Sequence, residues 1–129
     1  MYVPEYARTY VEQKGSKEVS YAELCEIAQH QIEELKRLTV SGERLVFLDT
    51  ELIVTKVWFD YAFGQVPEWF EQAIKAYPMD VYLLTYPDLP WVPDPARYNG
   101  SDAMRKELFD RYEAEIQVLD IPYYIIKHK

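Results

Sequence analysis

The chain has 129 residues, of which 49% are hydrophobic and 16% aromatic, so residues 1–129 have the size and apolar content of one folded domain. Its 14 basic and 22 acidic residues give a formal charge of −8, which argues against nucleic-acid or membrane-surface partners. The single cysteine excludes an internal disulfide and a Cys-based zinc cluster. No apolar run reaches the ~20 residues of a spanning helix, and the first residues form no signal peptide, so we expect a cytoplasmic protein.

The apolar pattern predicts strands that alternate with helices. In order, these are a strand end at residues 2–3, a helix at 20–38, a strand at 45–48 (LVFL), helices at 51–63 and 66–76, a strand at 81–85 (VYLLT), a helix around 109–119 and a strand at 123–126 (YYII). The strand segments are continuous apolar runs, which indicates strands covered on both faces, as in a parallel sheet. We therefore predict an α/β fold, a three-layer αβα sandwich.

Several positions in the helical segments carry more specific predictions. Ser20 and Glu23 form a capping-box signature at the start of the first long helix. Cys25 in that helix is expected to be a small buried side chain, and Trp69 to be a packing residue on a later helix. His30 has no second His or Cys at ligand spacing, so we expect no transition-metal site.

The first candidate site residues follow the strand at 45–48. Asp49 and Thr50 come directly after it, and ligands of open parallel sheets bind beyond the carboxyl ends of the strands. A carboxylate at Asp49 could hold a hydrated Mg²⁺ beside a bound nucleotide. The alternative that Asp49 caps the helix beginning near Glu51 stays open at this point.

The second candidate is the N-terminal segment VPEYAR, in which Glu5 follows the strand end and Arg8 lies one helical turn later. An acid there could accept a hydroxyl proton during phosphoryl transfer, and the arginine could neutralise the transferred charge. The alternative is a surface ion pair at a helix start, because Glu and Arg three residues apart are common on helices.

The third candidate is the irregular segment 86–101 (YPDLPWVPDPARYNGS), which contains four prolines. A loop of this length inside a domain is more often functional than idle. Trp91 could cover a flat ring and Arg97 could reach a phosphate when the loop closes over the site, with Asp94 between them. The alternative is a proline-stiffened loop whose tryptophan packs on the body of the domain.

Taken in order, the segments YVPEYAR, IAQHQ, LVFLDTELIVTKVWF and YLLTYPDLPWVPDPARYN resemble a known family. They are similar to the ATP-binding kinase domain of bacterial NadR-type nicotinamide riboside kinases, a branch of the P-loop nucleoside kinases. The resemblance covers almost the entire chain, and its most specific part is DT after a strand together with D-x-P-W-x-x-D-x-x-R. It implies phosphorylation of a ribose hydroxyl of a nucleoside by ATP and Mg²⁺, a step of NAD biosynthesis.

The resemblance also implies roles for individual residues. Asp49 would be the acid on the Mg²⁺ side, Arg97 the lid arginine, and Glu5 the acid that orients the acceptor hydroxyl. The substrate-binding residues implied in the same way are Arg8, Gln31, Thr50, Trp91 and Asp94.

The chain departs from this family at the phosphate-binding loop. The family begins with a strand and a G-x-x-x-x-G-K-[ST] loop that cradles the phosphates, and residues 1–129 do not contain that motif. In the family's sheet this strand lies between those corresponding to 45–48 and 81–85. We therefore expect two half-sheets with unpaired edges, no phosphoryl transfer by this chain alone, and completion by a missing N-terminal segment or in a homo-oligomer.

Three functions remain open from the sequence. The first is part of an ATP-dependent nucleoside kinase, with a nucleoside-type small molecule as its partner. The second is a non-catalytic module, either a binding module for a nucleotide-like ligand or a regulatory module. The third is a P-loop ATPase relative of other specificity.

Overall fold

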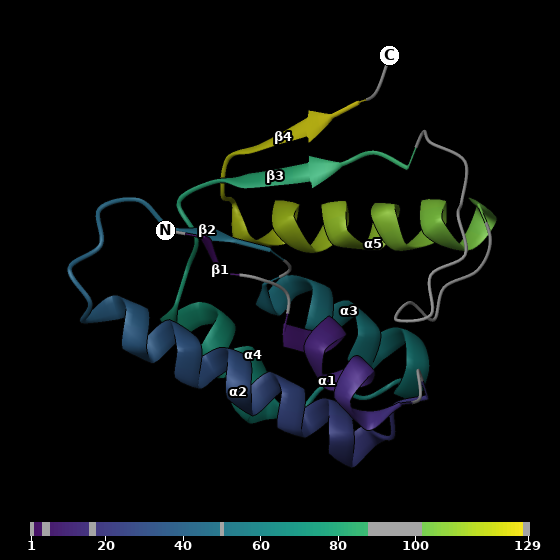
Figure 1. Cartoon of the computed structure of the whole chain (residues 1–129). Coiled ribbons are helices and arrows are strands. Elements are labelled where there is room, and N and C mark those ends of the chain that lie inside the picture. The colour runs from purple at the N-terminus through teal and green to yellow at the C-terminus, as the bar shows by residue number, and fades with distance from the viewer. Residues whose placement is uncertain (1, 4–5, 16–17, 50, 88–101, 128–129) are drawn as a thin grey trace. The chain divides into compact units, whose positions relative to one another are not determined.

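A computed structural model describes residues 2–3, 6–15, 18–49, 51–87 and 102–127 (Figure 1). The chain divides into two units, Met1–Tyr77 and Pro78–Lys129. Each unit combines a parallel pair of strands with one or more helices, which confirms the predicted parallel α/β class. None of the helices in the described ranges is both long and apolar enough to cross a membrane.

The described part of the first unit contains two strands and four helices. They are β1 (Tyr2–Val3), α1 (Tyr6–Lys14), α2 (Tyr21–Thr39), β2 (Phe47–Leu48), α3 (Leu52–Phe63) and α4 (Glu68–Ala76). β1 and β2 run parallel, with Tyr2 opposite Phe47 and Val3 opposite Leu48. Helix α2 contacts α1 and α3, and α3 also contacts α4. Each of the four helices therefore packs against at least one other.

The core of the first unit lies between α2, α3 and α4. Phe59 on α3 and Phe70 on α4 are both 0% exposed, and their ring centroids are 5.4 Å apart. Helix α3 ends at Gly64, which has φ +63° and donates its backbone N–H to the carbonyl of Asp60 at 2.8 Å. Glycine adopts this left-handed conformation without the steric penalty of a Cβ, and the predicted break between the helices at 51–63 and 66–76 is confirmed.

The capping box predicted at the start of α2 is present. The backbone N–H of Glu23 donates to Ser20 Oγ at 3.1 Å, and the backbone N–H of Ser20 donates to Glu23 Oε1 at 2.9 Å. Glu23 Oε1 also accepts a charged hydrogen bond from Lys14 Nζ at 2.8 Å, which joins the end of α1 to the start of α2. The hydrogen bond from Lys14, followed by that from the Ser20 backbone, lowers the pKa of Glu23 to about 2.

This depressed pKa predicts an acid-sensitive helix start. The folded-state pKa of Glu23 lies below the unfolded value, so its contribution is present above pH ~4.5 and is lost as the pH falls toward 2. At neutral pH, Glu23→Gln should lower the urea midpoint of unfolding, and the difference from wild type should shrink as the pH falls from 4.5 through about 2. Ser20→Ala should cost about 1 kcal/mol, measured in the same way. A pH-independent effect of Glu23→Gln would contradict the assigned ion pair.

The described part of the second unit contains β3 (Tyr82–Thr85), α5 (Asp102–Leu119) and β4 (Tyr123–Ile126). β3 and β4 pair in parallel from Tyr82 opposite Tyr123 to Thr85 opposite Ile126. Helix α5 lies along this pair (Figure 1) and contacts β3. The fourth predicted helical face is confirmed, since Phe109 and Ile116 are buried. The hydroxyl of Tyr123 donates to Glu113 Oε2 at 2.8 Å and ties β4 to the helix.

Two sequence predictions about burial are wrong. The strands β2 and β3 are not covered on both faces, because Phe47 and Leu83 are exposed. Each described sheet has two strands. Cys25 is half-buried rather than buried, because its side chain lies at the margin of the core formed by Leu24, Ile27 and Ala28 on α2.

Candidate functional site

The two strands β1 and β2 end at the same edge of their sheet, and a candidate residue follows β2 there. The register pairs Val3 with Leu48, so the chain leaves both strands at the same edge of the sheet. Asp49 is the next residue after Leu48, and it is exposed. The N-cap of α3 is Glu51, whose carboxylate accepts the backbone N–H of Ile53 at 2.7 Å. Asp49 therefore does not cap α3, and that alternative is wrong.

Several predicted residues lie outside the described ranges. Glu5 and Thr50 are among them, as are the loop residues Trp91, Asp94 and Arg97. Their roles stay predictions. Arg8 belongs to α1 by its backbone, and its side chain also lies outside the described part.

Helix α1, which carries Arg8, is held on α2 by aromatic and polar contacts. The Tyr6 ring stacks on the His30 ring with centroids 3.6 Å apart and planes at 13°. The Tyr10 hydroxyl donates to Glu26 Oε2 at 3.0 Å. Desolvation, and then the contact with this carboxylate, raises the pKa of Tyr10 to about 12, so the phenol stays a donor at neutral pH. These contacts fix the segment that follows β1.

Gln31 lies in the interface between α2 and α3. Its side chain is buried, and its Oε1 accepts a hydrogen bond from the Thr55 hydroxyl at 2.7 Å. The role that the structure gives Gln31 is therefore to join two helices. Its predicted contact with an acceptor stays a prediction.

Two lysine side chains lie near one aromatic ring at the carboxyl edge of the β3·β4 pair. Tyr86, the residue after β3, donates its backbone N–H to the carbonyl of Ile126 and meets the Phe109 ring edge-on at 5.0 Å. Lys127 Nζ lies 5.0 Å and Lys106 Nζ 5.9 Å from the Tyr86 ring centroid. A hydrogen bond to Asp110 at 2.6 Å raises the pKa of Lys106. The segment 86–101 thus starts beside two cationic groups, which composition alone did not indicate.

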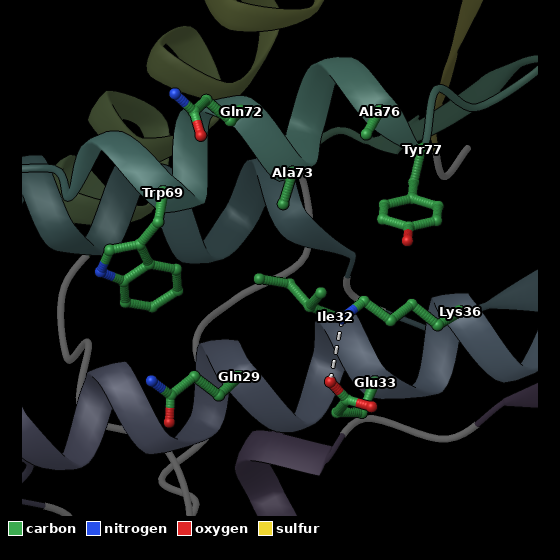
Figure 2. A pocket seen from close by; sticks show the side chains of 9 residues that line it. All are labelled: Gln29, Ile32, Glu33, Lys36, Trp69, Gln72, Ala73, Ala76 and Tyr77. Atoms are coloured by element: carbon green, nitrogen blue, oxygen red, sulfur yellow. Dashed lines mark hydrogen bonds and ion pairs between the residues drawn. The ribbon is translucent and has the colours of Figure 1, made fainter.

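A groove between α2 and α4 was not predicted from the sequence. Figure 2 shows Trp69 and Tyr77 extending from the α4 side toward α2, with Ala73 and Ile32 between them. Trp69 is 39% exposed, which corrects its prediction as a packing residue. The signal that could have indicated the groove is the set of small side chains on the same helix. The lining residues are Gln29, Ile32, Glu33, Lys36, Trp69, Gln72, Ala73, Ala76 and Tyr77.

Comparison with protein families identifies the lineage of the chain. An AAA-domain family model matches residues 1–129, the full length of the chain. The chain belongs to the AAA-domain family. This AAA-type P-loop membership supports a nucleotide-related function.

The AAA domain offers one carboxylate of the right kind for Mg²⁺. Mg²⁺ is usually bound by one or two carboxylates together with waters and substrate phosphates. The exposed Asp49 at the sheet edge fits a Mg²⁺ that arrives with its nucleotide. Within the described ranges no group of three or more His, Cys, Asp or Glu side chains could hold a metal ion by itself.

Proposed function

We propose that this AAA domain is the acceptor and lid portion of an ATP-dependent nucleoside kinase of the nicotinamide riboside type. The reaction would transfer the γ-phosphoryl group of ATP to a ribose hydroxyl, with ADP as the leaving group. Glu5 would accept the proton of the attacking hydroxyl, and Arg97 would neutralise charge on the transferred group. Asp49 would hold Mg²⁺, which would supply positive charge that neutralises the phosphates of ATP.

The observation that carries the proposal is the position of Asp49. It directly follows β2, whose parallel partner β1 ends at the same sheet edge, and in the sequence the Glu5–Arg8 segment comes shortly after β1. Ligands of parallel sheets bind at this edge. The D-x-P-W-x-x-D-x-x-R segment adds residues suited to cover a flat nucleoside and to bind phosphate.

A binding experiment separates the candidate functions. Nicotinamide riboside is titrated into the 129-residue chain by calorimetry, and MgATP is titrated separately. Because these residues lack the phosphate-binding motif, we expect riboside binding without phosphoryl transfer. Binding of MgATP with no riboside binding would instead favour an ATPase relative of other specificity.

The second candidate is a non-catalytic module that binds a nucleotide-like ligand. The feature that favours it is the same lack of G-x-x-x-x-G-K-[ST] within residues 1–129. It predicts riboside binding that is unaffected by ATP and metal ions. The kinase proposal predicts that Mg²⁺ and ATP have a site beside the riboside.

The metal assignment gives a separate prediction. Mn²⁺ with ATP should broaden the backbone NMR signals of Leu48 and Asp49, because the paramagnetic ion lies at the end of β2. Asp49→Asn should weaken this metal binding by about 10-fold and leave riboside binding unchanged. The control is Glu43→Gln, an exposed carboxylate before β2. Equal broadening in wild type and Asp49→Asn would remove Asp49 from the metal site.

A further inference from the structure

The groove between α2 and α4 is not used by the proposed reaction. None of its lining residues belongs to the predicted kinase site. Its volume is about 370 Å³, which lies in the range of ~300–1,000 Å³ typical of small-molecule sites. It is formed within the first unit, by the facing sides of two helices (Figure 2). The groove therefore has the dimensions of a second ligand site.

The space in the groove comes from small side chains opposite a large one. Ala73 and Ala76 occupy successive turns of α4 and face the half-buried Ile32 of α2. An alanine contributes only a methyl group, so the two helix surfaces do not fill the gap between them. The walls near the middle of the groove are apolar, and water in contact with them is readily displaced by an apolar ligand.

Aromatic rings lie at both ends of the groove. Trp69 is 39% exposed although the next residue, Phe70, is 0% exposed. Its indole meets the Phe70 ring edge-on, with planes at 88° and centroids 6.0 Å apart. Tyr77, just after α4, is half-buried at the other end. Exposed indole surface on a cavity wall is the surface on which a flat ring stacks most favourably.

The polar groups of the groove are neutral or neutralised. Gln29 and Gln72 contribute carboxamides, each of which can donate and accept hydrogen bonds. Glu33 and Lys36 form an ion pair with each other at 3.2 Å on the α2 side. The groove therefore presents no net charge to a ligand, and its hydrogen-bonding groups match an amide-like edge.

We infer that this groove binds an uncharged, planar aromatic ring that carries an amide-like hydrogen-bonding edge, as a nucleobase or an aromatic carboxamide does. The ring stacks on Trp69, and the edge exchanges hydrogen bonds with the glutamine carboxamides. Charge complementarity favours this class over phosphorylated ligands, because Lys36, the cation among the described lining residues, is already paired with Glu33.

The test uses benzamide and adenine as probes, with cyclohexanecarboxamide as the saturated control. Binding to the full 129-residue chain is followed by the NMR signals of the Trp69 indole N–H and of the Gln29 and Gln72 side-chain amides. The two aromatic probes should shift these signals saturably, and the saturated amide should shift them little. Equal binding of the aromatic and saturated amides would overturn the stacking assignment.

Substitutions in the groove test whether the probes bind there. Trp69→Leu should weaken binding of the aromatic probes by about 10-fold. Ala76→Leu, at an exposed position, should fill the groove and also prevent the probes from binding. Tyr61→Leu is the matched control, because Tyr61 is 36% exposed on α3 and does not line the groove. Unchanged binding in both groove variants would overturn the proposal. Signal changes that follow protein concentration rather than probe would overturn it as well, and would show instead that a second copy of the chain occupies the groove.

Discussion

Replacing Phe59 with alanine is expected to lower the free energy of unfolding of the first unit by about 3–5 kcal/mol. The Phe59 ring is 0% exposed, with its centroid 5.4 Å from that of Phe70 and 5.6 Å from that of Tyr21. It therefore lies where α2, α3 and α4 meet. Truncation removes buried apolar surface and also leaves a cavity, and both effects destabilise the folded state. Urea unfolding followed by far-UV circular dichroism measures the loss.

The matched control for this prediction is Phe63→Ala on the same helix. Phe63 also meets the Tyr21 ring edge-on, at 5.5 Å, but it is 37% exposed. Its truncation leaves little cavity, so we expect a loss of about 1 kcal/mol or less. A loss at Phe59 no larger than the loss at Phe63 would mean that the three helices do not share one core.

The features that could be predicted from the sequence are those specified by local chemistry. Ser20 and Glu23 satisfy each other's backbone within one turn, so their spacing alone indicates where α2 begins. Gly64 ends α3 because its φ of +63° suits a residue without a Cβ. Both signals act over a few neighbouring residues and do not depend on the rest of the fold, which explains why both predictions are confirmed.

The features that could not be predicted depend on contacts between residues that are far apart in the sequence. The apolar runs of β2 and β3 indicated strands but could not show which faces are covered, and Phe47 and Leu83 are exposed. Trp69 occurs at helical spacing beside buried residues, yet it lies on a groove because Ala73 and Ala76 leave room there. A hydrophobic residue type reports a preference for burial and not the shape of the surface opposite it.

The candidate site was predictable to the extent that it follows from strand direction. The carboxyl ends of parallel strands lie at one edge, so Asp49 could be assigned to that edge from its place after residues 45–48, and the register of Val3 with Leu48 agrees with this. The acceptor could not be assigned in this way. Family membership specifies a nucleotide-related function without the acceptor.

Gln31 offers the second large effect, because it is a polar side chain only 8% exposed, with a partner 24 residues away. Gln31→Leu leaves the 4% exposed Thr55 hydroxyl without its acceptor, so we expect a loss of about 1–3 kcal/mol in the free energy of unfolding. Thr55→Val should lower the free energy of unfolding by a similar amount.

The double variant replaces both polar groups with apolar ones of similar shape. Its loss should therefore be smaller than the sum of the two single losses, by about 0.5–3 kcal/mol. Urea unfolding of the four proteins completes the cycle. Additive losses would mean that the two side chains are not coupled.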